Sequence, residues 1–118
     1  ATLNSNCYYP KTYVPDNIFE QTLINLGLDD ILDDSVNTSY IQSVTYLDIN
    51  YLDIYDLTGI EAFVSLTELY CNDNQLTSLD LINNTALEYL YCYDNQLTSL
   101  DISQNTNLIE LYCPKVPI

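Results

Sequence analysis

The chain has 118 residues, of which 47% are hydrophobic, so it is long and apolar enough for one small domain with a packed interior. Its 17 acidic residues outnumber the two basic ones, Lys11 and Lys115, and give a formal net charge of −15. This charge excludes nucleic acid and anionic membranes as expected partners, because almost nothing is available to neutralise phosphate groups. No apolar run of about 18 residues is present, so no membrane insertion is expected.

Residues 1–43 are predicted to form an N-terminal segment with one capping helix. The helix is expected to begin after Pro15. Either Asn17 and Glu20 form a capping box, or Asp16 is the cap. Apolar side chains at helical spacing predict a face that covers the open end of the following structure. These side chains are Phe19, Leu23 and Leu26.

An acid-rich connector, residues 28–43, follows the predicted helix stop at Gly27. Its aspartates leave a weak possibility of calcium binding, although their spacing does not match an EF-hand loop and a solvated turn is the default interpretation. The candidate ligands are Asp29, Asp30, Asp33 and Asp34. Before the helix, residues 1–14 are predicted to be irregular, and Cys7 has no evident partner.

A repeat of 21 residues organises the remainder of the chain. Residues 66–86 and 87–107 are identical at 14 of 21 positions without a gap. A unit this short cannot bury an apolar face alone, so the copies must stack on one another. The predicted repeats are 44–65, with Gly59 marking an extra turn, then 66–86, 87–107 and a partial copy at 108–118. After that last strand, either a short irregular tail covers the final turn or the chain is part of something longer.

Each repeat contains an x-L-x-L-x segment typical of a strand, in which alternate side chains point inward and outward. Neighbouring strands lie about 4.8 Å apart, so equivalent outward positions should form columns. The predicted central column is Asp48, Tyr70, Tyr91 and Tyr112. The flanking columns are Tyr46, Glu68, Tyr89 and Glu110 on one side, and Asn50, Asn72, Tyr93 and Pro114 on the other.

These columns predict a tyrosine-rich sheet face, centred on Tyr91 and rimmed by carboxylates. Aromatic anchors with a polar rim are typical of binding surfaces. The alternative is packing alone, since aromatic residues suit strands and stack across them. The candidate binding residues are Tyr46, Asp48, Glu68, Tyr70, Asn72, Tyr89, Tyr91, Tyr93, Glu110 and Tyr112.

The inward positions carry residues that we interpret as structural. Cys71, Cys92 and Cys113 share one phase and should form a buried ladder of free thiols, because parallel neighbours hold their Cβ atoms too far apart for a disulfide. With no histidine in the chain, a zinc site is not expected. The turn asparagines are expected to satisfy backbone groups. They are Asn74, Asn95, Asn84 and Asn105, with Asp53 serving in the first repeat.

No catalytic constellation stands out, and we expect neither an enzyme nor a cofactor. Histidine is absent and only two glycines are present, so a nucleophile–histidine pair and a phosphate-binding loop are excluded. Glu68 and Glu110 should lie about 9.6 Å apart, two strand spacings. Both would be exposed on an open face, where nothing raises the pKa of either carboxyl group.

These segments resemble bacterial leucine-rich repeats. The template L-x-x-L-x-L-x-x-N-x-L is matched by Leu66, Leu69, Cys71, Asn74 and Leu76, and again by Leu87, Leu90, Cys92, Asn95 and Leu97. Residues 57–61 resemble the 22-residue repeats of internalin-type surface proteins, and residues 14–21 are similar to the N-terminal cap of secreted bacterial repeat proteins. The resemblance covers residues 13–113. It implies an α/β-type repeat solenoid, right-handed, with a short parallel β-sheet on the concave face and a mostly irregular convex side.

The resemblance further implies an extracellular or bacterial cell-surface protein that binds other molecules. We expect first a module or scaffold for protein–protein interaction through the tyrosine-rich face. Two alternatives stay open. The face could bind carbohydrate, with tyrosine rings stacked on sugars, or the chain could be a structural spacer within a larger secreted protein.

Overall fold

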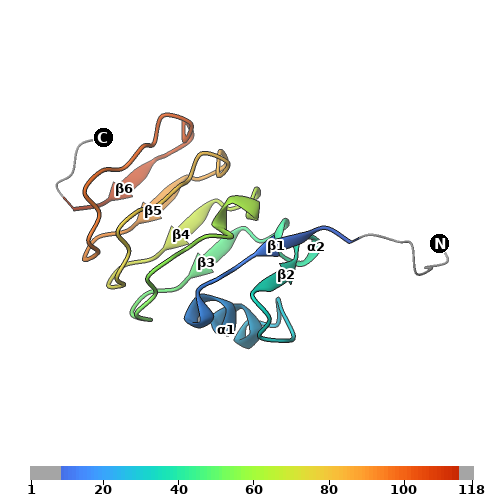
Figure 1. The fold of residues 1–118 in the computed structure, drawn as a ribbon. Coiled ribbons are helices and arrows are strands. Elements are labelled where there is room, and N and C mark those ends of the chain that lie inside the picture. Colours follow the sequence, from blue (N-terminus) through green and yellow to red (C-terminus); the bar gives the residue numbers. More distant parts are fainter. Residues whose placement is uncertain (1–8, 115–118) are drawn as a thin grey trace.

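The structure, a computed structural model, describes residues 9–114, and its main feature is one parallel sheet built by the repeats (Figure 1). Each repeat contributes one short strand, and the strand order is β3-β4-β5-β6. The strands are β3 (Tyr46–Asp48), β4 (Glu68–Tyr70), β5 (Tyr89–Tyr91) and β6 (Glu110–Tyr112). Consecutive repeats therefore form consecutive turns of a solenoid, as predicted. The predictions for Cys7 and for the tail 115–118 fall outside the described residues.

Alternation along each strand separates the interior of the solenoid from its surface. The central side chains of Leu69 and Leu90 are fully buried, and Leu47 is nearly so. Their neighbours in the same strands are half-buried or exposed. Leu111, in β6, is only partly buried against the core, because no described turn stacks on that strand. The stacking of turns therefore buries the apolar columns that a single repeat cannot bury.

Asn74 forms a hydrogen-bonded bridge between two turns, as predicted. Its Oδ1 accepts from the backbone N–H groups of Leu52 and Ile54 (3.1 and 3.0 Å), and its Nδ2 donates to the carbonyl of Ile49 (2.9 Å). The role predicted for Asp53 is wrong: that residue is exposed, with φ 57°. In the first repeat, the position equivalent to Asn74 is Leu52. The backbone groups of that turn bond instead to the side-chain amide of Asn74 in the next repeat. On the return side the predicted role is filled by Asn84 and Asn105.

The return segments are mostly irregular, as predicted, and contain one 3₁₀ turn, η1 (Ile60–Ala62), among the described repeats. Gly59 precedes this turn with φ 110°, a conformation that favours glycine. A Cβ atom there would lie 2.8 Å from a side-chain carbon of Val14 and 3.0 Å from the carbonyl oxygen of Tyr13. Glycine thus lets the first repeat approach the N-terminal cap closely.

The helix α1 (Asn17–Asn25) covers the end of the sheet beside β3, opposite β6 (Figure 1). Asp16 is its cap: one carboxylate oxygen accepts from two N–H groups of the first turn (2.9 and 3.0 Å). The other oxygen accepts from two backbone N–H groups of the first repeat (2.9 and 3.1 Å). The alternative capping box of Asn17 and Glu20 is not formed, because the carboxylate of Glu20 bonds to the loop before β2.

The apolar face of α1 differs at one position from the prediction. Phe19 and Leu23 are fully buried, and the ring of Phe19 stacks on that of Phe63 with centroids 6.3 Å apart. Leu26 is 53% exposed. Its predicted burial is wrong: Leu26 is the C-cap residue, and at this end of the helix its side chain lies at the surface.

The cap also contains short elements that the sequence analysis missed. The strand β1 (Lys11–Tyr13) pairs antiparallel with β2 (Ser35–Asn37), and a second short helix, α2 (Thr38–Ile41), follows. The prediction of irregular structure for 1–14 is wrong at Lys11–Tyr13, and β2 and α2 within the acidic connector 28–43 were not predicted. Three-residue strands show no local periodicity, and their pairing joins distant segments. No helix in the described part of the chain is both long and apolar enough to cross a bilayer.

Candidate functional site

The parallel register converts the repeated sequence positions into columns on the outward side of the sheet. Asp48, Tyr70, Tyr91 and Tyr112 are paired in one column. Tyr46, Glu68, Tyr89 and Glu110 are paired in the other. Both columns have the composition that the repeat predicted. We call these eight residues the tyrosine face.

Four tyrosine rings on this face pack in sequence. The centroid separations are 5.5 Å between Tyr46 and Tyr70, 4.9 Å between Tyr70 and Tyr91, and 4.6 Å between Tyr91 and Tyr112. The rings are tilted or edge-on, with interplanar angles of 49°, 65° and 53°, the arrangement that aromatic quadrupoles favour. The two inner rings are half-buried. The two end rings, Tyr46 and Tyr112, are 54% and 51% exposed.

Two glutamates hold the hydroxyl groups of the inner rings. The hydroxyl of Tyr91 donates to Oε2 of Glu110 (2.7 Å), and that of Tyr70 donates to Oε1 of Glu68 (2.9 Å). These hydrogen bonds raise the pKa of both tyrosines to about 12, because an ionised phenolate would lose its bond and face a carboxylate. The face therefore presents ordered rings whose hydroxyl protons are already engaged by carboxylates.

Asn72 was predicted to be a site residue on the surface, but its side chain is buried. It is only 3% exposed, and its Oδ1 accepts from the backbone N–H of Tyr93 (3.0 Å). Its own N–H donates to Oδ1 of Asn50 (2.7 Å). The prediction that Asn72 contacts a partner is wrong, because the side chain bonds to the neighbouring turn. Tyr93 remains at the surface with 38% exposure.

Beyond the ends of the strands lies an edge that the sequence analysis did not identify. Tyr51, Asp73 and Asp94 occupy equivalent repeat positions with φ values of 59°, 57° and 53°. The hydroxyl of Tyr51 donates to the carboxylate of Asp73, which raises the pKa of Tyr51. Desolvation, and then contact with Asp73, raise the pKa of Asp94. We call Tyr51, Asp73, Tyr93 and Asp94 the acidic edge. The repeated Asp at this phase was the available signal.

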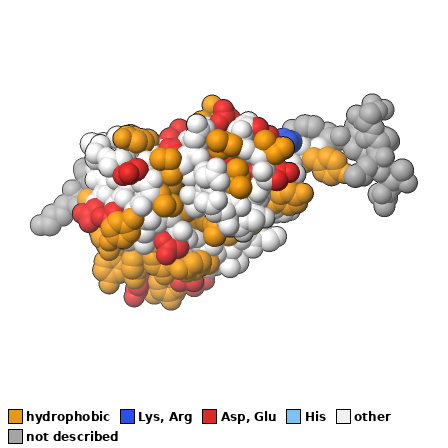
Figure 2. Space-filling model, turned by 90° about the horizontal axis from the view of Figure 1, so that it is seen from below, with side chains coloured by type: hydrophobic (Ala, Val, Ile, Leu, Met, Phe, Trp, Pro, Cys, Tyr) orange, Lys and Arg blue, Asp and Glu red, His pale blue; other side chains and the backbone are white. Residues whose placement is uncertain are grey.

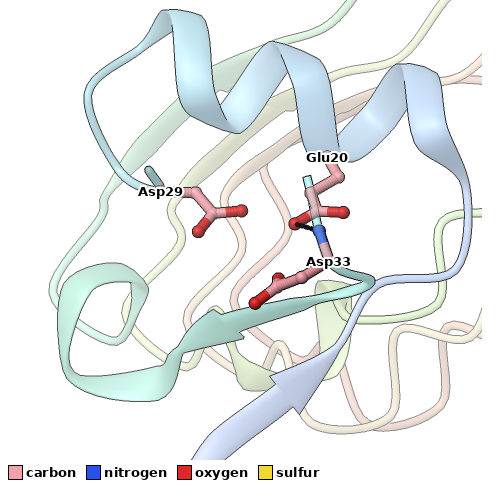
Figure 3. Close-up of side chains that lie close together, drawn as sticks. All are labelled: Glu20, Asp29 and Asp33. Carbon is pink, nitrogen blue, oxygen red and sulfur yellow. Dashed lines mark hydrogen bonds between the residues drawn. The ribbon is translucent and has the colours of Figure 1, made fainter. Parts of the chain in front are cut away.

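The calcium candidates of the connector are only partly brought together. Side-chain oxygens of Asp29 and Asp33 lie within 4.8 Å of each other and of Glu20, whereas Asp30 and Asp34 contribute none (Figure 3). Both oxygens of Glu20, which is fully buried, accept from the N–H groups of Asp33 and Asp34 (3.1 and 2.8 Å). Burial, and then contact with Asp29, raise the pKa of Glu20 to about 7. The cluster thus attaches α1 to the loop before β2.

The cysteines occupy the inward positions expected of them. Cys71 and Cys92 are fully buried and Cys113 is half-buried, and all three thiols are free. Burial raises the pKa of Cys92 to about 12 and that of Cys71 well above its usual range. Both therefore remain neutral thiols that pack as small apolar side chains.

The connecting segments outside the sheet also form surface features. A cavity of about 330 Å³ lies among the connecting segments, where Asp56, Glu61, Ser78 and Asp80 contribute polar groups. In Figure 2, hydrophobic side chains, which there include tyrosine, gather in patches with acidic groups between them, and one basic side chain is visible at the edge of the molecule. Lys11 is the one basic residue among residues 9–114.

Known proteins share both the sequence and the shape of this chain. No protein-family model matches it. Over 52 residues, 44% of the chain, it is 42% identical to internalin J of Listeria monocytogenes serotype 4b. The functional domain of InlJ from Listeria monocytogenes, described as including a cysteine ladder, aligns with 91% of the chain at a TM-score of 0.78 and 33% identity. Internalin C2 from strain 4b F2365 aligns with 91% of the chain and 60% of its own length at a TM-score of 0.65, and its 17% identity shows the fold alone.

This chain spans a small part of these relatives. The match covers 6% of internalin J and 24% of the solved InlJ domain. The agreement in fold nevertheless extends over the cap as well as the repeats, because it includes nine-tenths of the chain.

Proposed function

Because this chain is an internalin-like leucine-rich repeat protein, we propose that its tyrosine face binds a protein partner on or outside a bacterial cell. The observation that carries the proposal is the row of four outward tyrosines, Tyr46, Tyr70, Tyr91 and Tyr112, rimmed by carboxylates. Tyrosine offers large, rigid contact area with little loss of conformational entropy. We propose no catalytic role for the face.

Packing within the sheet accounts for only part of this row. Tyr70 and Tyr91 each lie between two rings and gain stability from them, about 0.5–1.5 kcal/mol per aromatic pair. Tyr46 and Tyr112 leave about half of their surface exposed. The interior of the solenoid is filled by leucine columns and does not need outward aromatic side chains. Contact with a partner therefore explains the end rings better than a spacer role does.

Carbohydrate binding is the second candidate, and the ring geometry supports it less. A sugar stacks on an open aromatic face. Here the rings are 4.6 to 5.5 Å apart and tilted against one another, so neighbouring rings take up much of that face. An extended row of ring edges with a polar rim fits the broad, shallow contact typical of protein partners.

The test compares a tyrosine of the tyrosine face with an exposed tyrosine elsewhere on the molecule. Tyr91→Ala removes the ring at the centre of the row, and Tyr40→Ala removes a 56% exposed ring on α2, which belongs to the cap and not to the tyrosine face. Retention of surface proteins in a pull-down and binding to a glycan array would be measured for both variants and the parent chain. We expect Tyr91→Ala alone to lose protein retention.

Two outcomes would contradict this proposal. Unchanged protein retention by Tyr91→Ala would remove the tyrosine face as the binding surface. Loss of glycan binding in Tyr91→Ala, with protein retention unaffected, would establish the carbohydrate alternative instead.

A further inference from the structure

Within residues 9–114, no base neighbours the tyrosine face or the acidic edge. The face carries Asp48, Glu68 and Glu110, and the edge adds Asp73 and Asp94. The only base among residues 9–114 lies in β1 of the cap. Five carboxylates thus share one continuous side of the sheet and one end of its strands, and the described part of the chain places no counter-charge among them.

The hydrogen-bonding capacity of the face is equally one-sided. The hydroxyl protons of Tyr70 and Tyr91 are donated to Glu68 and Glu110. A carboxylate has two oxygens and about four acceptor sites, so each glutamate can still accept from a partner after it has accepted from a tyrosine. The carboxylates of the face only accept, and the hydroxyl groups of Tyr46, Tyr89 and Tyr112 are its other donors. A cation that donates therefore complements the charged groups of the face.

We infer that the partner presents an arginine-rich segment to the tyrosine face, with guanidinium groups lying against the exposed end rings, Tyr46 and Tyr112, and donating to Glu68, Glu110 and Asp48. This inference rests on the proposed function and names the chemistry of its partner. A guanidinium is planar, carries five donors and combines stacking on an aromatic ring with a bidentate bond to a carboxylate.

The geometry favours arginine over lysine. Glu110 accepts from the hydroxyl of Tyr91 (2.7 Å), whose ring packs 4.6 Å from the exposed ring of Tyr112, so this end ring and the anion are within reach of a single flat cation. At the other end, Glu68 accepts from Tyr70 (2.9 Å), whose ring packs 5.5 Å from the exposed ring of Tyr46. A lysine ammonium is a compact, strongly hydrated charge that can pair with the anion but does not stack.

The same charges disfavour the other occupants of an open face. A second copy of this chain would bring another net charge of −15 against the first. Anionic lipids and acidic glycans would be repelled in the same way. A cationic protein segment is the occupant that the charges attract, and long-range attraction would also accelerate its association.

The test uses three synthetic decapeptides in which Ser alternates with Arg, with Lys or with the neutral analogue citrulline. Their binding to the whole chain would be measured by fluorescence anisotropy at low and physiological salt. We expect the Arg peptide to bind about 2- to 5-fold more tightly than the Lys peptide, from the cation–π contribution at partly exposed sites. The citrulline peptide should bind far more weakly than both.

Matched variants separate local recognition from general attraction. Glu110→Gln and Asp80→Asn each remove one exposed carboxylate, the first from the tyrosine face and the second from a connecting segment. We expect Glu110→Gln and Tyr112→Ala to weaken Arg-peptide binding and Asp80→Asn to leave it unchanged. Circular dichroism would show that each variant retains its fold.

Equal binding of the Arg and Lys peptides, or equal weakening by Glu110→Gln and Asp80→Asn, would overturn the inference, because both indicate unspecific charge attraction. Absence of Arg-peptide binding would also overturn it. If Tyr91→Ala still abolished retention of a surface protein in that case, the proposed function would stand and only the arginine-rich partner would be excluded. If retention were unaffected as well, both would fail.

Discussion

Replacing Asn74 by alanine should remove a large part of the stability of this chain. The side chain is 4% exposed, and its Oδ1 accepts from two backbone N–H groups of the preceding turn. Its Nδ2 lies within 2.9 to 3.2 Å of three carbonyl oxygens, of Ile49, Cys71 and Asn72. Alanine would leave these buried groups without partners.

The expected magnitude follows from the number of groups that lose their bonds. Each buried donor or acceptor without a partner costs about 1–3 kcal/mol. Counting only the two N–H groups, Asn74→Ala should lower the free energy of unfolding by about 2–6 kcal/mol. Domains of this kind have a total stability of about 5–15 kcal/mol, so the variant should unfold at a clearly lower urea concentration than the parent chain.

Two other asparagines provide a graded comparison by urea denaturation. The Oδ1 of Asn95 accepts from one N–H group, that of Leu76, and the residue is only half-buried. Asn95→Ala should therefore cost about 1–3 kcal/mol. Asn83 is exposed, so Asn83→Ala should change stability by less than about 0.5 kcal/mol. If Asn74→Ala unfolded at the same urea concentration as Asn83→Ala, the hydrogen-bonded bridge between turns would not be what stabilises the stack.

Three further perturbations test other parts of the structure. Glu20 has a folded-state pKa of about 7, raised above the 4.5 expected in the unfolded chain. Its contribution to the free energy of unfolding should therefore be constant below pH 4.5 and be lost as the pH rises toward 7. Melting temperatures of Glu20→Gln should lack this decline, and an identical pH slope in both proteins would contradict the assignment. Tyr91 has a pKa of about 12, so Glu110→Gln should bring part of the tyrosine absorbance change at 295 nm to lower pH; an unchanged titration would contradict the hydrogen bond. Gly59→Ala places a Cβ atom 2.8 Å from the side chain of Val14, whereas a Cβ atom at Gly27 would have nothing within 4 Å. Thermal unfolding should therefore show a larger drop in melting temperature for Gly59→Ala than for Gly27→Ala. The reverse order would refute the close contact.

The architecture could be predicted because the same pattern of leucines recurs every 21 residues. Residues 66–86 and 87–107 align without a gap, and each must bury its leucines against the next copy. Equal spacing then requires equal register, so Tyr70, Tyr91 and Tyr112 had to align in one column. The alternation of strand side chains placed that column outward.

The candidate site was less predictable because exposure depends on individual side-chain hydrogen bonds. Asn72 lies at an outward strand position by count, yet its amide bonds across to the next turn and is buried. Asp73 and Asp94 share one repeat phase, so the stacked turns bring them together at the end of the strands, but their left-handed backbone is seen only in the structure. Neither the burial of Asn72 nor this backbone conformation follows from hydrophobic spacing.

Repetition and alternation alone thus specify the stacked turns, their order and which side of the sheet holds tyrosine, because these depend on spacings that every copy shares. The cap has no second copy to compare with. Its β1–β2 pairing, the burial of Glu20 and the contact of Asp16 with the first repeat arise where segments distant in sequence meet. Only the packed chain decides them, because each depends on which backbone N–H groups are left without partners once the turns are in place.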